Sequence, residues 1–252
     1  MKNILNKKLV QRYSRQIILK DVGPAGQKKI IKSKVLVVGA GGLGCPVIDY
    51  LSRAGVGNIG VVDNDKVNIS NIHRQSLYNS KDIGKFKVNA VKQKIKLINP
   101  QVKIKTYKTR IEKKNIEKIF KNYNFIVDGS DNFKTKFLLN KYCLNRKKIL
   151  IVGAISKMDG HIFTFNFKNK NDPCLKCFYQ TDPSDDILNC EYEGILGPVA
   201  GIVGNIQAME ILKKILNLDK KSNNKILILD LFNLNFRKVQ FNKKKSCICK
   251  SS

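Results

Sequence analysis

One stretch, residues 34–44 (KVLVVGAGGLG), constrains the fold of this chain more than any other. A short β-branched run ends in Gly39, Gly41 and Gly44, and an amphipathic segment follows as far as Ala54. This order predicts a strand, a tight turn and a helix. Glycine permits such a turn, lets the backbone approach a phosphate group and allows the helix to pack closely on the strand. The free N–H groups at the start of the helix would face that anion.

An acidic residue stands where this kind of turn needs one. A second apolar run, 59–62, ends at Asp63, about 20 residues after the last glycine, where a carboxylate can accept hydrogen bonds from ribose hydroxyls. The alternative is a glycine turn in an α/β protein that binds no nucleotide. Strand, turn, helix and acid together favour a nucleotide-binding site.

Composition excludes some classes of protein. Of 252 residues, 42% are hydrophobic and 27% charged, as in soluble globular proteins. The longest nearly apolar run, 195–204, is too short and too rich in glycine to span a bilayer, and residues 1–9 contain no apolar core of a signal peptide. We therefore expect a cytoplasmic protein without a membrane partner.

The net charge of +29, from 48 basic and 19 acidic residues, would ordinarily suggest nucleic acid. Here the lysines are spread along the whole chain among many asparagines and isoleucines, with no basic arm and no arginine-rich block. This distribution is typical of a compositional bias, so we expect no nucleic-acid partner. An attraction for acidic protein partners remains compatible with the charge.

Alternating strand and helix patterns predict an α/β fold with a Rossmann-like, mostly parallel, doubly wound sheet. The predicted strands are 34–38, 58–62, 102–107, 125–128 and 149–153, and the predicted helices are 43–54, 86–98, 113–121 and 133–145. After residue 153 the pattern changes to antiparallel strands at 161–167, 225–230 and 236–241, an irregular segment at 182–197 and a helix at 199–216.

We expect the chain to form a single domain over 1–252, with three parts. Residues 1–30 form a helical arm with Tyr13, Ile17, Ile18 and Leu19 on its apolar side, 31–155 form the nucleotide-binding part, and 156–252 form an appended part with a cysteine-bearing tail.

Polar residues follow several predicted strands at the carboxyl edge of the sheet, where open α/β sheets bind ligands. Arg74, in the long loop 63–75, and Lys87, at a helix start, are placed to neutralise phosphates. Asp131 follows strand 125–128 and is a candidate Mg²⁺ ligand. Its alternative role is the N-cap of the next helix, and the two roles can be divided between Asp131 and Asn132.

Taken together, these motifs resemble the ThiF/MoeB/HesA family, the bacterial relatives of ubiquitin-activating enzymes. The resemblance covers about residues 8–249. It rests on the order and spacing of RYSRQI at 12–17, GAGGLG at 39–44, Asp63 with Asp65, SNIHRQ at 70–75, Lys87, Asp131 with Asn132, the Cys174/Cys177 pair and GPVAG at 197–201.

The resemblance implies adenylylation, in which the C-terminal glycine carboxylate of a ubiquitin-like sulfur-carrier protein ending in Gly-Gly attacks the α-phosphate of ATP. On the matching positions it assigns the nucleotide to Gly42 and its neighbours, the ribose to Asp63, the phosphates to Asn71, Arg74 and Lys87, and Mg²⁺ to Asp131. Asp65, Ser70 and Asn132 belong to the same nucleotide site. Arg15 resembles an arginine that enters the ATP site of the partner subunit, which implies a homodimer.

The carrier would be of the ThiS type, in thiamine-thiazole synthesis, or of the MoaD type, in molybdopterin synthesis, with a cysteine desulfurase as a further partner. The motif at 12–16 and Asn189-Cys190 slightly favour the thiazole pathway. Two alternatives from other classes are an NAD-dependent oxidoreductase, because the glycine turn and Asp63 also suit dinucleotides, and a non-enzymatic protein that binds zinc and nucleic acid.

The seven cysteines argue for reduced thiols or metal ligation rather than disulfides. Cys45 and Cys143 lie in predicted helices, where we expect small buried residues. Cys174 and Cys177, in a predicted loop, together with Cys247 and Cys249, predict a structural zinc site with four thiolates. The alternative is four unligated thiols.

Two further cysteine predictions depend on the resemblance. The second cysteine pair of the family is usually Cys-x-x-Cys, so the shorter Cys247-Ile-Cys249 makes Cys249 the least secure ligand. Cys190, in the irregular segment, corresponds to a cysteine that links some family members covalently to the carrier. A basic loop can activate such a thiol, although a dispensable cysteine is equally compatible with the sequence.

Overall fold

The computed structural model describes residues 4–169, 172–179, 194–218, 225–245 and 247. Its centre is one eight-stranded sheet with the order β3-β2-β1-β4-β5-β6-β7-β8. The strands are β1 (Lys34–Val38), β2 (Asn58–Val62), β3 (Lys103–Tyr107), β4 (Phe125–Asp128), β5 (Ile149–Ser156), β6 (Asp159–Asn166), β7 (Lys225–Asp230) and β8 (Asn235–Gln240).

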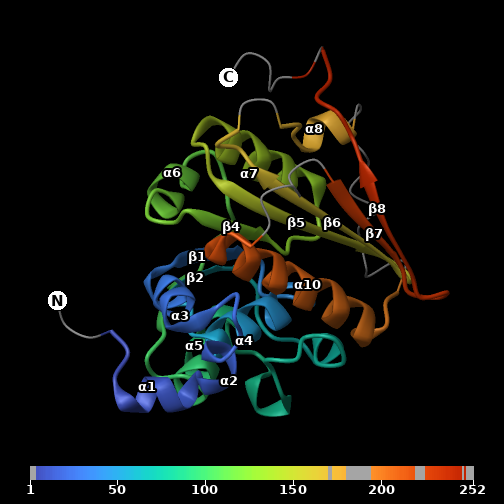
Figure 1. Cartoon of the computed structure of the whole chain (residues 1–252). Coiled ribbons are helices and arrows are strands. Elements are labelled where there is room, and N and C mark those ends of the chain that lie inside the picture. Colours follow the sequence, from blue (N-terminus) through green and yellow to red (C-terminus); the bar gives the residue numbers. More distant parts are fainter. Residues whose placement is uncertain (1–3, 170–171, 180–193, 219–224, 246, 248–252) are drawn as a thin grey trace.

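The sheet changes direction at β5. Strands β1 to β5 pair in parallel, whereas β5–β6, β6–β7 and β7–β8 are antiparallel (Figure 1). The first half of β5 pairs with β4, and its whole length pairs with β6. The predicted α/β fold, a parallel Rossmann-like sheet with antiparallel strands added after it, is therefore confirmed.

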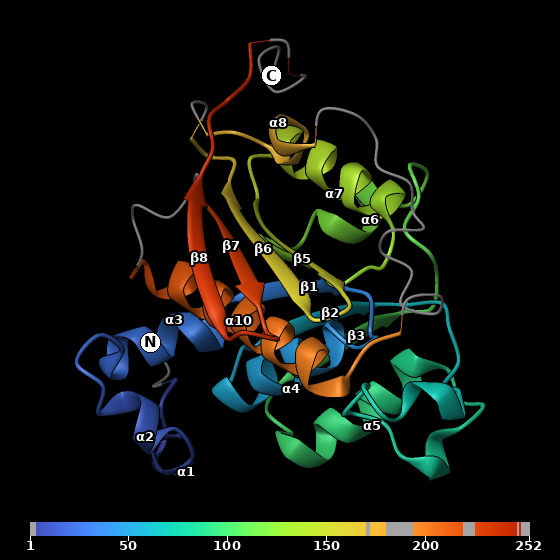
Figure 2. The same ribbon diagram turned by 90° about the vertical axis from the view of Figure 1, so that its right-hand side faces the viewer.

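Helices cover both faces of the sheet, as Figures 1 and 2 show. Alternate side chains of each strand point to opposite faces, so Val35 and Val37 pack in one apolar cluster and Leu36 and Val38 in the other. The first cluster includes α3 (Gly23–Lys32), α4 (Gly44–Ala54), α5 (Lys87–Ile98) and α10 (Gly197–Leu216), and the second includes α6 (Ile116–Phe120), α7 (Phe133–Asn145) and α8 (Leu175–Phe178).

The N-terminal arm is helical, as the sequence predicted, but two of the four residues expected on its apolar side are exposed. It is divided into α1 (Lys7–Arg12), α2 (Ser14–Ile17) and α3. Tyr13 is buried and its hydroxyl accepts a hydrogen bond from Asn99 Nδ2 at 2.9 Å, but Ile18 and Leu19 are exposed. A new helix begins after residue 22 because Gly23 has a φ of +55° and Pro24 fits only the first turn of a helix.

Among the described residues, no helix has both the length and the apolar character needed to cross a membrane.

Candidate functional site

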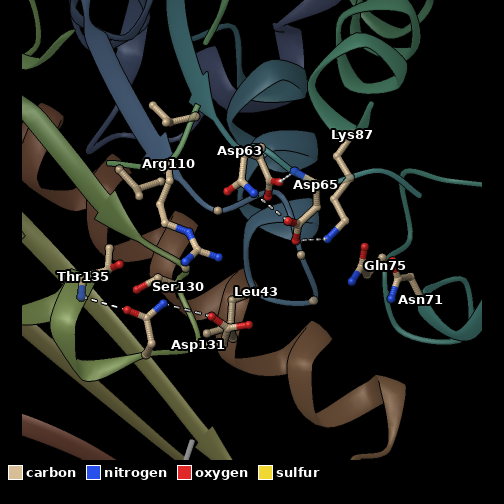
Figure 3. A pocket seen from close by; sticks show the side chains of 18 of the residues that line it. Leu43, Asp63, Asp65, Asn71, Gln75, Lys87, Arg110, Ser130, Asp131 and Thr135 are labelled. Atoms are coloured by element: carbon tan, nitrogen blue, oxygen red, sulfur yellow. Dashed lines mark hydrogen bonds and ion pairs between the residues drawn. The ribbon is translucent and has the colours of Figure 1, made fainter. Parts of the chain in front are cut away.

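A cavity of about 540 Å³ opens where β1, β2 and β4 end (Figure 3). It brings together residues that lie far apart in the sequence, as expected for the carboxyl edge of a parallel sheet. Among its lining residues are these predicted ones: Gly39, Gly41, Gly42, Asp63, Asp65, Ser70, Asn71, Arg74, Lys87, Asp131 and Asn132. Gly44 and Arg15 are described by the structure but do not line this cavity.

The glycines of the turn have different roles. Gly39 has a φ of +89°, and a Cβ there would lie 2.7 Å from the carbonyl oxygen of Gly129. A Cβ on Gly44 would overlap the carbonyl oxygen of Gly39, so this glycine lets α4 begin directly against the turn. At Gly41 the nearest atom to an added Cβ is 3.7 Å away, on the Gln75 side chain. Gly39 and Gly44 therefore shape the turn, whereas Gly41, which lines the cavity as Gly39 does, leaves free space beside it.

Asp63 is held by the backbone of the turns around it. Its two carboxylate oxygens accept hydrogen bonds from the backbone N–H groups of Ala40, at 2.7 Å, and Asp65, at 2.8 Å. Burial raises the pKa of Asp63, while the nearby charge of Lys87 and these two hydrogen bonds lower it. Each oxygen keeps a second acceptor site, so the fixed carboxylate can also bind ribose hydroxyls.

Lys87 is the first residue of α5, and its side chain is buried beside the cavity. Its Nζ lies 3.1 Å from Oδ2 of Asp65, and its backbone N–H donates to the carbonyl of Asp65 at 2.9 Å. Figure 3 shows the ammonium group directed into the same space as Asp65. The loop after β2 and the start of α5 are thus joined at the site.

The loop 68–75 is fixed by its own side chains. Asn68 Oδ1 accepts from the N–H of Ser70 at 3.0 Å, and Asn71 Oδ1 accepts from the N–H of Asn68 at 3.2 Å. Arg74 Nη1 donates to the carbonyl of Ser70 at 2.7 Å. The oxygen of Asn71 is therefore used within the loop, which leaves its amide N–H groups for a ligand.

Gln75 is a lining residue to which the sequence analysis gave no role of its own. Only 3% of it is exposed, and its Oε1 has no hydrogen-bond partner among the described residues. A buried polar atom without a hydrogen-bond partner raises the free energy of the folded state. Because Oε1 of Gln75 lies at the wall of a cavity, we expect a bound molecule to supply the missing contact.

Asp131 and Asn132 divide the two predicted roles. Asn132 is the N-cap of α7, since its Oδ1 accepts from the backbone N–H of Thr135 at 2.9 Å. Asp131 is exposed and lines the cavity, with its Oδ1 3.2 Å from Asn132 Nδ2. The Asp131 carboxylate is therefore accessible to a cation, and carboxylate oxygens are ligands that Mg²⁺ prefers.

A buried ion pair below the cavity was missed by the sequence analysis. Asp128 Oδ2 lies 3.3 Å from Lys136 Nζ, and both side chains are almost fully buried. Lys136 also donates to the carbonyls of Ser130 and Gly153, each at 2.7 Å, while the Ser130 hydroxyl donates to Asp128. This network fixes the loop that carries Asp131. The sequence offered one signal for this pair: an acidic residue at the end of a predicted strand and a lysine eight residues later in a predicted helix.

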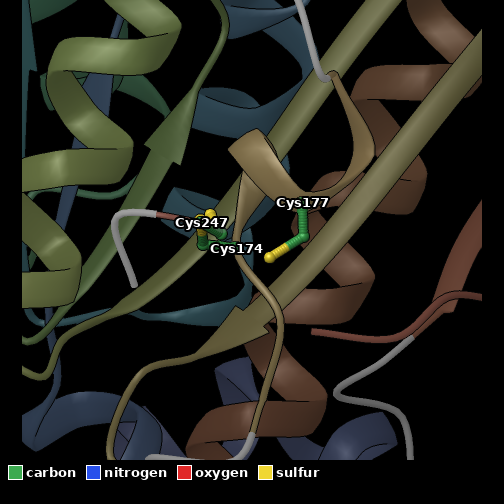
Figure 4. Close-up of side chains that lie close together, drawn as sticks. All are labelled: Cys174, Cys177 and Cys247. Atoms are coloured by element: carbon green, nitrogen blue, oxygen red, sulfur yellow. The ribbon is translucent and has the colours of Figure 1, made fainter. Parts of the chain in front are cut away.

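Three of the four predicted metal ligands are brought together by the fold (Figure 4). Cys174 and Cys177 lie at the N-cap and inside the short helix α8, not in a loop as predicted, and Cys247 lies beyond β8. Their sulfur atoms all lie within 4.8 Å of one another, and the Cys174–Cys247 separation is 3.5 Å. Tetrahedral zinc with Zn–S bonds of about 2.3 Å needs sulfur atoms about 3.8 Å apart, so these thiols fit that ion.

Burial raises the pKa of Cys174 to about 11, with the neighbouring thiols adding to the shift and the Asn140 side chain opposing it. Such a thiol stays protonated near neutral pH unless a cation stabilises the thiolate. Cys45 and Cys143 are fully buried in α4 and α7, as predicted. Cys249 and Cys190 lie outside the described residues, so the predictions made for them stay predictions.

The model of the ThiF family matches residues 13–250. The chain belongs to the ThiF family. This match includes both the cavity and the cysteine cluster, so it confirms the resemblance inferred from the motifs.

Curated relatives from the ThiF family have names that describe adenylyl transfer. The chain is 38% identical to a probable molybdopterin-synthase adenylyltransferase of Gracilaria tenuistipitata var. liui, covering 91% of this chain and 64% of the relative. It is 38% identical to the adenylyltransferase and sulfurtransferase MOCS3 of Culex quinquefasciatus, covering 96% and 55%. It is 37% identical to the sulfur carrier protein adenylyltransferase of Thermus thermophilus, covering 96% and 90%. The chain thus spans only slightly more than half of the MOCS3 relative.

Solved structures share the fold. A crystal structure of E. coli MccB with ATP aligns with a TM-score of 0.82 at 20% identity, covering 96% of this chain and 75% of that one. At this identity the likeness shows the fold of this ThiF family member and nothing further.

Proposed function

We propose that this protein is an ATP-dependent adenylyltransferase that activates the C-terminal glycine carboxylate of a ubiquitin-like sulfur-carrier protein. A carboxylate oxygen of the carrier attacks the α-phosphorus of ATP, the bond from that phosphorus to the β-phosphate bridge breaks, and pyrophosphate leaves. The product is an acyl-adenylate. The observation that supports the proposal is that Asp63, the glycine turn, Lys87 and Arg74 all line one cavity. The names of the relatives support the same reaction.

The residues of the cavity suit this chemistry. The carrier carboxylate is already ionised at neutral pH, so the reaction needs placement and positive charge more than a general base. Asp63 orients the ribose, the N–H groups of the turn approach the phosphates, and Lys87, Arg74 and Asn71 stabilise the charge that develops on the leaving pyrophosphate. Asp131 would hold Mg²⁺, which supplies further positive charge beside the phosphates when bound.

The partners of this reaction extend the proposal. The carrier is of the ThiS or MoaD type and ends in Gly-Gly, and a cysteine desulfurase is a further proposed partner. We place the protein in the cytoplasm. The cysteine cluster would hold Zn²⁺ through Cys174, Cys177 and Cys247, with Cys249 as the proposed fourth ligand. Cys190 as a covalent attachment point stays a prediction.

A homodimer is part of the proposal because of the position of Arg15. It lies in α2, is exposed and does not line the cavity of its own chain. We infer that an arginine that serves the reaction from that position acts on a second copy of the chain.

Isotope exchange between pyrophosphate and ATP tests the reaction. The protein is mixed with carriers of the two types, MgATP and labelled pyrophosphate, and label should enter ATP only when the matching carrier is present. A carrier without its two terminal glycines is the control. Failure with every carrier, together with tight binding of NADH in place of ATP, would support the dinucleotide alternative instead.

A further inference from the structure

Two cations that line the cavity, Lys66 and Arg110, have no role in the proposed reaction. Arg110 lies in the connection between β3 and α6, and its guanidinium points into the cavity (Figure 3). It enters between Asp63 and Ser130, on the opposite side of Asp63 from Lys87 (Figure 3). Within the part of the chain that the structure describes, the Arg110 side chain makes no hydrogen bond or ion pair.

The backbone that carries Arg110 is fixed. Asn115 Nδ2 donates to the carbonyl of Arg110 at 2.8 Å, and Asn115 Oδ1 accepts from the N–H of Glu112 at 3.0 Å. The hydroxyl of Thr109 donates to the same carbonyl at 3.1 Å, and the next side chain, Ile111, is buried in the apolar core. The guanidinium is therefore presented from a preorganised loop.

The shape of a nucleotide decides which part of it meets Arg110. The base, on C1′, and the phosphate chain, on C5′, leave the ribose from opposite ends of the ring, and the 2′- and 3′-hydroxyls lie on the edge between those ends. If Asp63 holds those hydroxyls and the phosphates extend toward Lys87 and Arg74, the base extends toward Arg110. Guanidinium planes stack on the π-faces of nucleobases, with cation–π attraction added.

We infer that Arg110 is a nucleotide-binding residue that stacks on the base of ATP. The inference rests on the proposed function, because it takes the orientation of the nucleotide from the roles of Asp63 and Lys87. It adds a contact that selects a nucleotide with an aromatic base over a bare polyphosphate. Arg110 is exposed, so its replacement leaves the apolar core untouched.

Calorimetric titration of the full chain with two ligands tests this contact. One ligand is ATP and the other is inorganic tripolyphosphate, which has the phosphates but no base. Arg110→Leu should weaken ATP binding about fivefold to thirtyfold, the range that cation–π contacts provide, and leave tripolyphosphate binding unchanged. Arg110→Lys, which keeps the charge but loses the plane, should recover only part of the ATP affinity. Lys113→Leu removes an exposed charge from the same connection and is the matched control.

Three outcomes would overturn the inference in different ways. Equal weakening of ATP and tripolyphosphate by Arg110→Leu would make Arg110 a phosphate ligand. Unchanged binding of both would make it a bystander. Parent protein that binds tripolyphosphate but not ATP would contradict the proposed function itself, and the inference with it.

Discussion

The ammonium group of Lys87 lies 3.1 Å from the carboxylate of Asp65, although only 7% of the lysine side chain is exposed against 55% of the aspartate. The charge of a buried lysine is thus directed at a solvent-accessible cavity. A bound triphosphate would meet a cation already oriented by Asp65, so little reorganisation would be needed during the reaction.

Replacing Lys87 tests this arrangement. Lys87→Gln should lower the rate of pyrophosphate exchange by about 10²-fold or more, the usual effect of removing a preorganised charge donor. The melting temperature should fall as well, because the charge of Lys87 also stabilises the buried carboxylate of Asp63. Lys85→Gln removes an exposed lysine paired with Asp82 and should leave exchange unchanged.

The same variant has a pH signature. The charge of Lys87 lowers the pKa of Asp63, which burial raises, so Lys87→Gln should raise that pKa further. Protonated Asp63 accepts hydrogen bonds from ribose less well. As the pH is lowered, the variant should therefore lose adenosine binding at a higher pH than the parent protein does. If the acid side of the pH profile is the same in the variant and the parent protein, the charge of Lys87 does not act on Asp63.

Asp131 and Asn132 should respond differently to alanine substitution. Asp131→Ala should abolish exchange and leave thermal unfolding unchanged, because the side chain is exposed at the cavity. Asn132→Ala should cost about 1 kcal/mol of stability through the loss of the α7 N-cap. Full exchange activity in folded Asp131→Ala would remove Asp131 from the site.

Mixing inactive variants tests the dimer. Arg15→Ala should lose exchange activity, but Arg15→Ala mixed with Asp131→Ala should regain part of it, because each hybrid dimer has one site with both groups intact. Lys8→Ala, an exposed change in the same arm, is the control. If heterodimers form and activity does not return, Arg15 acts within its own subunit or not at all.

Metal analysis tests the cysteine cluster. The purified protein should contain about one zinc per chain, and Cys174→Ser or Cys177→Ser should lose the metal together with thermal stability. Cys249→Ser should have a milder effect if its short spacing to Cys247 weakens that ligand. Cys143→Ala removes a buried thiol outside the cluster and should keep the zinc. Stable protein that contains no metal and gains none from added zinc would contradict the assignment.

The ion pair below the cavity makes a prediction for stability. Lys136→Met should destabilise the protein by about 3–5 kcal/mol, because it leaves the Asp128 carboxylate buried without a counter-charge. Asp128→Asn combined with Lys136→Met should recover much of that loss, as measured by urea unfolding. A double variant no more stable than Lys136→Met would show that the carboxylate charge is not the cause.

The sequence predicted the features that depend on local pattern. Apart from β3, the parallel strands are short apolar runs with β-branched residues. Four of the five strands begin and end within one residue of their predicted positions, whereas β5 extends to Ser156, beyond the predicted end at residue 153. Helix α6 is shorter than the predicted 113–121 because Asn115 binds the residues before it and so delays the start of the helix.

The features that the sequence did not reveal depend on contacts between distant segments. The sequence presents Lys136 as a surface lysine on a helix, whereas in the fold the middle of β5 supplies its acceptor, the carbonyl of Gly153. Arg110 and Gln75 face the cavity only because the sheet brings three loops to one edge. Their residue types carry no such information in so basic a chain.

The cysteine cluster also has a consequence for the rim of the sheet. Among the described strands, β8 lies at the edge of the sheet and every one of its residues is exposed. A sheet edge without a neighbouring strand invites strand addition from other chains. Cys247 follows β8 and lies beside Cys174, which is 73 residues earlier in the chain. A metal held between these two residues would fix the end of β8. It would also join two distant parts of the chain and so shorten the loop that the unfolded chain has to close. If a chelator removed the metal during purification, the end of β8 would be released. The protein should then self-associate before the nucleotide cavity is lost.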